Sequence, residues 1–224
     1  ILSVDNKHSD AHNLLGAVYV ATKNFKLAEK HLLKATKYAS NYAPAHYNLG
    51  KAYLDQKKHY LALSAFSKAV KLQPDYADAM FLQANTRIQL GAVAEAQLGY
   101  EEVIKLAPEN FEAHNNLGSA LQELGNSEAA INHHKAAIAL KPTFELAYLN
   151  LAYALVSLER NNEALSVYED CLKHCSSAKL HQNLGITLQQ IGRMKDAQQA
   201  YLQAIKIDPA MGSAYRHLAE ITKV

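Results

Sequence analysis

The sequence predicts an all-α protein: a right-handed α-solenoid (superhelix) of six tandem helix-turn-helix repeats, followed by a single C-terminal helix. Two observations predict it. A pattern of Leu-Gly, then Tyr or Leu three residues later, then a small Ala and a Pro, recurs every 34 residues. Within each copy the apolar residues follow helical spacings of three and four. Because one such unit cannot bury its own apolar face, the repeat dictates the fold of the whole chain.

Each repeat is expected to hold a first helix (A) and a second helix (B) that pack against each other. The second copy shows the pattern in full, with Leu49, Gly50 and Tyr53 on helix A and Phe66 on helix B. The third copy is degenerate, and the fifth is one residue short and has Ser176 where Pro is expected. The elements run in this order: a remnant of a preceding repeat helix at 1–8, repeats at 9–42, 43–76, 77–110, 111–144, 145–177 and 178–211, and a capping helix at 212–224.

Gly and Pro mark the ends of the expected helices. Between the A and B helices, where a left-handed backbone is convenient, stand Gly91, Gly125 and Gly192. Just beyond the B helices, where they interrupt no helical ladder, stand Pro74, Pro108, Pro142 and Pro209. The fifth repeat lacks this Pro, so we expect a tighter or irregular turn at Ser176 and Ser177.

These marks fit the tetratricopeptide repeat pattern Trp-x2-Leu-Gly-x2-Tyr…Ala-x3-Phe…Pro, and the chain is identified as a member of that family. One departure is systematic: the first aromatic position is His in four copies, and the chain has no Trp. The resemblance implies a scaffold for protein–protein interactions, with the ligand in the concave groove. We interpret the four histidines, His12, His46, His114 and His181, as substitutes for the packing aromatic residue.

The two ends of the chain differ. Residues 1–6 align with residues 204–209, the end of a B helix, so we expect the chain to begin inside a repeat and to be a piece of something longer. The C-terminal helix carries polar residues for a capping role. The N-terminal end has no comparable polar outer face. Its exposed apolar edge favours self-association through the terminal repeats.

Composition and charge narrow the classes of partner. Apolar residues make up 49% and charged residues 20%, which supports a packed core and excludes disorder. No apolar run is long enough for a membrane span. The net charge is only +2, but Lys26, Lys30, Lys34 and Lys37 form a stripe that is either a solvated face or a contact for an acidic partner. Few Lys or Arg fall in the groove, so we expect no nucleic acid there.

The predicted binding surface consists of A-helix residues that point away from the packed face. Its N-terminal half is more apolar and aromatic, and its C-terminal half is richer in amides. We expect a protein or peptide ligand there, as an extended peptide or a partner helix. The candidate residues are Asn13, Tyr47, Asn48, Lys51, Phe81, Asn85, Asn115, Asn116, Ser119, Gln122, Asn150, Tyr153, Gln182, Asn183 and Gln189.

Four of these share one repeat position: Asn48, Asn116, Asn150 and Asn183. An amide offers both a donor and an acceptor, so it can pair with the backbone of an extended peptide whatever its side chains. The pattern resembles the asparagine ladder of O-linked N-acetylglucosamine transferases, which holds a peptide backbone. The alternative is that these amides support helix packing. Related repeats that bind the C-terminal tails of chaperones use a pair of cationic side chains in the groove. This chain lacks that pair, so we do not expect a chaperone tail as the ligand.

Catalysis and cofactors are not expected. The chain shows no Gly-rich phosphate loop, nucleophile elbow or His-Glu-x-x-His motif, so we predict that it is not an enzyme and binds no cofactor. The repeated histidines stand about 10 Å apart, too far to share a metal ion. Cys171 and Cys175 are expected to be structural because two Cys one helical turn apart point poorly for a disulfide; a redox pair and a metal site remain as alternatives.

A second hypothesis makes the chain the substrate-recruiting arm of a larger transferase. Residues 209–224 resemble the segment that joins such repeats to a sulfotransferase domain in some bacterial proteins. Glycosyltransferases with repeat arms are the related case. A parent sequence with several hundred further residues and a phosphosulfate or nucleotide-sugar site would favour this hypothesis.

Overall fold

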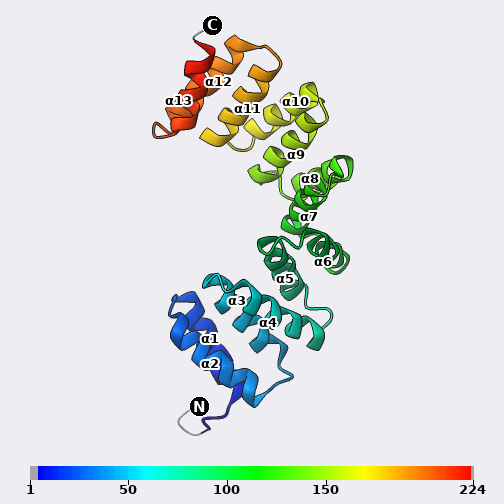
Figure 1. Ribbon diagram of the computed structural model, residues 1–224, viewed down its shortest axis with the longest axis vertical. Helices are drawn as coiled ribbons and strands as arrows, with labels where there is room; N and C mark the ends of the chain where they lie inside the picture. The colour runs from blue at the N-terminus through cyan, green and yellow to red at the C-terminus, as the bar shows by residue number, and fades with distance from the viewer. Residues whose placement is uncertain (1–4, 223–224) are drawn as a thin grey trace. The chain divides into compact units, whose positions relative to one another are not determined.

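The computed structural model describes residues 5–222, and within that range the chain is built from thirteen α-helices without a strand (Figure 1). It divides into two compact units, one ending at Pro108 and the other beginning at Glu109. The first unit contains α1 (Ser9–Ala21), α2 (Phe25–Tyr38), α3 (Ala43–Asp55), α4 (His59–Leu72), α5 (Ala77–Gln89) and α6 (Val93–Leu106). The second contains α7 (Phe111–Glu123), α8 (Ser127–Leu140), α9 (Glu145–Ser157), α10 (Asn161–Leu172), α11 (Ala178–Gln190), α12 (Met194–Ile207) and α13 (Gly212–Ile221).

Within each unit the helices pack as consecutive A and B helices. Each A helix pairs with its own B helix, as α1 does with α2, and each B helix packs on the next A helix, as α2 does on α3. Successive A helices also touch, α1 with α3 and α9 with α11. The predicted all-α class, a solenoid of helix-turn-helix repeats, is confirmed. No described helix has the length and apolar character needed to cross a membrane.

The Leu-Gly signature is explained by a close approach of the two helices in one repeat. A Cβ atom added at Gly50 would lie 2.6 Å from the ring of Phe66, and one at Gly185 would lie 2.5 Å from the ring of Tyr201. Gly118 faces the ring of His134 in the same way, at 2.7 Å. The A-helix glycine therefore makes the space that the large B-helix side chain fills, and both lie in the core.

The turns between A and B helices all need a left-handed residue. Gly91, Gly125 and Gly192 have positive φ, as predicted. The other three turns place a larger residue in the same conformation: Lys23, Lys57 and Glu159, with φ of 57°, 58° and 59°. Because a side chain is disfavoured in the left-handed conformation, each of these three turns carries a conformational free-energy cost that glycine would avoid.

The two ends of the chain are partly outside the described residues. The expected remnant helix at 1–8 falls on residues 1–4, which are not described, and on Asp5 to His8, which form a turn. His8 caps α1 by accepting a hydrogen bond from the Ala11 N–H at 3.3 Å. The C-terminal helix is described as far as Ile221, and the last two residues of the expected 212–224 helix lie outside the description.

The fifth repeat is irregular, as predicted from its missing residue and missing Pro. Its B helix, α10, has 12 residues, whereas α2, α4, α6, α8 and α12 have 14 each. Ser177 then caps α11, since its Oγ accepts from the Leu180 N–H at 3.1 Å and donates to Glu145 Oε1 at 2.6 Å. The short helix and the Ser cap together replace the Pro-ended junction of repeats two, three, four and six.

Candidate functional site

The aromatic candidates of the first unit are held in place by neighbouring rings. Tyr47 on α3 lies 5.0 Å from the ring of Tyr76, and the Lys51 ammonium stands 5.5 Å from the centre of the Tyr47 ring. Burial, together with the Asp78 carboxylate, raises the pKa of Tyr47, so its hydroxyl stays neutral. Phe81 on α5 packs 6.1 Å from the ring of Tyr100. These side chains are half-buried, which leaves one face of each for a contact.

Two candidate amides lie inside the packing between A helices instead of on the surface. Asn13 is 5% exposed, and its Oδ1 accepts a hydrogen bond from Nδ2 of Asn48 at 2.9 Å. Asn115 is 1% exposed, and its Oδ1 accepts from Nδ2 of Asn150 at 3.0 Å. Both residues precede the ladder position by one. The same position holds Leu149 in the fifth repeat, also buried, so it is a packing position that faces the next A helix.

Asn115 is the centre of a larger polar network in the second unit. Nδ1 of His134, a fully buried ring, donates to Asn115 Oδ1 at 3.1 Å, which assigns the proton to that nitrogen. Asn115 Nδ2 donates to Asn116 Oδ1 at 3.4 Å, and Asn150 Nδ2 also reaches Ser119 Oγ at 3.3 Å. Asn150 is thus bonded to an amide of the repeat before it, as Asn48 is to Asn13.

Four further candidates are amides on the A helices: Asn85, Gln122, Gln182 and Gln189. Tyr hydroxyls of the B helices donate to two of them: Tyr100 to Asn85 Oδ1 at 2.6 Å and Tyr201 to Gln189 Oε1 at 2.7 Å. Gln122 instead holds a buried Nε2 without a hydrogen-bond partner among the described atoms. Gln182 is half-buried on α11.

A hollow between α9 and α11 brings two candidates together. Its volume is about 280 Å³, and its wall is mostly apolar. Tyr153 lies at its edge with 67% of its side chain exposed, and Asn183 faces it from α11. The full lining is Leu149, Tyr153, Val156, Tyr168, Asn183, Ile186, Thr187 and Gln190. The hollow therefore lies on the A-helix face where the binding surface was predicted.

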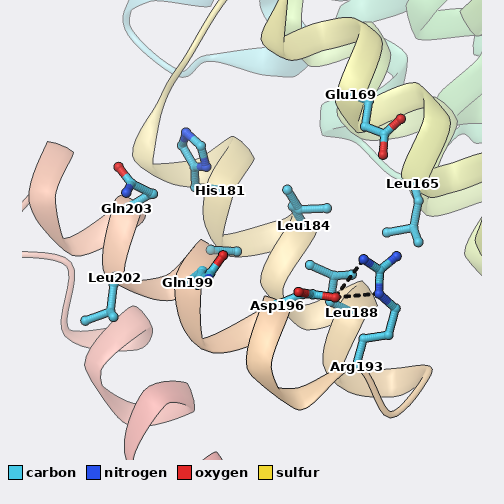
Figure 2. Close-up of a pocket in the computed structure, with 11 residues that line it drawn as sticks. Leu165, Glu169, His181, Leu184, Leu188, Arg193, Asp196, Gln199, Leu202 and Gln203 are labelled. Atoms are coloured by element: carbon cyan, nitrogen blue, oxygen red, sulfur yellow. Dashed lines mark hydrogen bonds and ion pairs between the residues drawn. The ribbon is translucent and has the colours of Figure 1, made fainter.

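A second hollow, of about 410 Å³, lies on the B-helix side of the second unit, between α10 and α12 (Figure 2). Leu165 and Glu169 come from α10, while Arg193, on the opposite wall, binds Asp196 at 2.6 Å. None of the candidate binding residues lines it.

The repeated His position has a role that the sequence did not reveal. Nε2 of His12 lies 3.0 Å from the carbonyl oxygen of Asn6, and Nε2 of His46 lies 3.0 Å from that of Ser40. Each ring reaches back six residues into the preceding turn, a contact in which imidazole N–H donates to the carbonyl. Within residues 5–222, no group of three or more His, Cys, Asp or Glu side chains is placed to hold a metal ion.

Comparisons with known proteins agree with this repeat structure. Tetratricopeptide repeat family models match residues 9–42, 43–76, 78–110, 100–132, 146–173 and 178–211. No curated protein matches the chain.

Solved structures are similar in fold. MamA has a TM-score of 0.71 and 21% identity, over 75% of this chain and 92% of that one. YrrB, described as a tetratricopeptide repeat protein with an unusual peptide-binding site, has a TM-score of 0.69 and 21% identity, and the match covers 86% of this chain and 98% of that one. Pseudomonas aeruginosa pilF has a TM-score of 0.76 and 19% identity, and the match covers 96% of both chains. At these identities the likeness establishes the fold alone.

Proposed function

Because this chain belongs to the tetratricopeptide repeat family, we propose that its A helices bind an extended segment of a partner protein. Repeats of this family are typically non-enzymatic scaffolds for protein interactions, and the fold shared with MamA and YrrB supports that general role. The finer proposal concerns where the segment binds and which side chains hold it.

The observation that carries the proposal is the hollow between α9 and α11 with Tyr153 at its edge. A tyrosine that is two-thirds exposed beside an apolar hollow is the kind of residue that dominates protein interfaces. The hollow, at about 280 Å³, is at the small end of ligand pockets. It suits one or two side chains of a peptide better than a whole small-molecule ligand.

The amide contacts also favour a refined form of the ladder. Asn48 and Asn150 each use their Nδ2 group to bind the amide of the preceding repeat. Their Oδ1 atoms are the groups left to accept a hydrogen bond, so we infer that at Asn48 and Asn150 the ladder accepts backbone N–H groups of the ligand. The packing role and the binding role of these residues are then compatible, because the side-chain nitrogen supports packing and the side-chain oxygen contacts the ligand.

The spacing of the A helices supports an extended ligand over a helical one. Packed helices stand about 10 Å apart. A polyproline II segment rises about 3.1 Å per residue with three residues per turn, so it presents the same face about every 9 Å. Each repeat can then meet an equivalent N–H of the ligand, whereas a partner helix has no free N–H in its interior.

The first test uses a phage-displayed library of random peptides as the probe, with selected peptides measured by fluorescence anisotropy. Tyr153→Ala should weaken their binding about tenfold or more. Tyr60→Ala is the matched control, because Tyr60 is 77% exposed on the B helix α4 and should leave binding unchanged. Equal affinity of the wild-type protein and Tyr153→Ala for every enriched peptide would reject this surface.

The second test asks whether the ladder holds backbone. N-methylation of successive backbone nitrogens in a selected peptide should weaken binding at about every third position. Asn183→Ala should abolish the penalty at one of those positions, as a double-mutant cycle would show. Asn183 is the residue of choice because its side chain makes no described hydrogen bond that the substitution would remove. If the penalties are the same in both proteins, Asn183 does not contact the ligand backbone.

A further inference from the structure

Cys171 and Cys175 lie at the irregular end of α10 with their sulfur atoms in contact. The two Sγ atoms are 3.1 Å apart, and both thiols are free. Cys171 is completely buried, whereas Cys175 is partly exposed. The sequence alone predicts two Cys one helical turn apart on a helix, which point poorly for a disulfide. The helix ends at Leu172, so Cys175 lies just beyond the turn that follows it.

We propose that Cys171 and Cys175 form a two-electron oxidation site that closes to a reversible intrachain disulfide and braces the junction between α10 and α11. The backbone already suits the bond, since the Cys175 N–H donates to the Cys171 carbonyl at 2.9 Å. That contact keeps the helical i, i+4 spacing, in which Cα atoms stand about 6 Å apart, inside the range of disulfides. Closing the bond needs the sulfur atoms to approach by only about 1 Å.

The chemistry assigns different roles to the two thiols when a peroxide is the oxidant. Cys175, the more accessible one, attacks hydrogen peroxide and becomes a sulfenic acid, with release of one water. Cys171 then attacks that sulfur, and the second water leaves as the disulfide forms. Two thiols and one peroxide thus yield one disulfide and two waters. Burial raises the pKa of the Cys171 thiol, which supports its role as the second, resolving group.

The position of the pair gives the disulfide a structural consequence. The segment that follows Cys175 joins α10 to α11 through few contacts: Ser176 Oγ lies 3.1 Å from His181 Nε2, and Ser177 Oγ donates to Glu145. Repeats two, three, four and six have Pro at this junction, which restricts the backbone covalently. A disulfide would supply a comparable covalent restraint in the fifth repeat, which lacks the Pro, and it would do so only under oxidation.

The test treats reduced, folded protein with hydrogen peroxide and follows intact mass and free thiols. We expect both thiols to disappear together, with the loss of two hydrogen masses per chain, no cross-linked dimer, and full recovery with dithiothreitol. Peptide mapping of the wild-type chain should join Cys171 to Cys175. A gain of oxygen instead of a loss of hydrogen, or a bond between chains, would overturn the proposal.

Two variants separate the roles. Cys175→Ser should leave Cys171 unreactive in the folded protein, and Cys171→Ser should give a sulfenic acid at Cys175 that dimedone traps. Amide hydrogen exchange of residues 173–177 should slow in oxidised wild-type protein and return on reduction. Unchanged exchange after complete oxidation would mean that the bond does not brace the junction. The wild-type mapping and exchange remain decisive even if Cys171→Ser fails to fold.

Discussion

His134 is the residue through which the fourth repeat should sense acid. Its ring is completely buried, donates from Nδ1 to Asn115 and packs against Gly118. The equivalent B-helix position of the second repeat holds Phe66, which packs against Gly50 in the same way. A Phe therefore fits the site in shape, and His134→Phe exchanges a titrating ring for one that does not titrate.

The size of the effect follows from the pKa of the ring. Burial, and to a lesser extent the neighbouring His133, lowers the pKa of His134 from 6.5 to about 4. Because the folded-state pKa is below the unfolded one, the unfolded chain binds a proton that the native chain excludes. Stability present above pH 6.5 is therefore lost as the pH falls toward about 4. At about pH 5 the loss is about 2 kcal/mol, at 1.36 kcal/mol per pH unit.

Urea denaturation of the two proteins, followed by circular dichroism at about pH 7.5 and about pH 5, measures this loss. The hydrogen bond to Asn115 that Phe removes costs about 1 kcal/mol at both pH values, so it cancels in the comparison. Relative to wild type, His134→Phe should gain about 2 kcal/mol on acidification. Burial also lowers the pKa of His31, His46 and His181, so only the difference between the proteins isolates His134. An equal stability difference at both pH values would refute the argument.

Three substitutions and one control, Gly212→Ala, test the packing by thermal denaturation. Gly50→Ala places a Cβ 2.6 Å from Phe66 and should cost about 1–3 kcal/mol, whereas Gly212→Ala, which meets nothing within 4 Å, should be neutral or slightly stabilising. A similar midpoint for both would count against the interlocking of Gly and aromatic side chains. Asn115→Leu leaves the buried His134 Nδ1–H without its acceptor and should cost about 1–3 kcal/mol, whereas Asn150 Nδ2 keeps its bond to Ser119; an unchanged midpoint would mean that the network is not formed. Lys57→Gly relieves a φ of 58° and should stabilise by up to about 1 kcal/mol, and a lower midpoint would show no strain there.

Much of the fold could be predicted because its signals are local. The Gly of the Leu-Gly pair and the aromatic residue that packs on it, such as Gly50 and Phe66, lie in one repeat and meet as neighbouring helices do. The left-handed turn was predicted at Gly91 from the residue type alone, but Lys57 and Glu159 adopt it without that signal. Those two turns are imposed by the packing of the helices on either side.

The candidate site was harder to predict because exposure depends on the next repeat. Asn13 and Asn115 share a helix face with exposed residues, yet the following A helix covers them and binds their Oδ1 atoms. Tyr153 and Asn183 lie at one hollow although they are on different A helices. The spacing within a single helix contains no information on how closely its neighbour approaches.

By itself, the sequence determined the repeat period, the alternation of A and B helices and the residues that fill each repeat, because these depend on helical spacing and side-chain size within about 34 residues. Only the tertiary structure decided which amides bind each other, where the hollows open and that the sulfur atoms of Cys171 and Cys175 touch. Those features depend on the distance between elements that different parts of the sequence encode. A shift of about 1 Å in that distance makes or breaks a hydrogen bond.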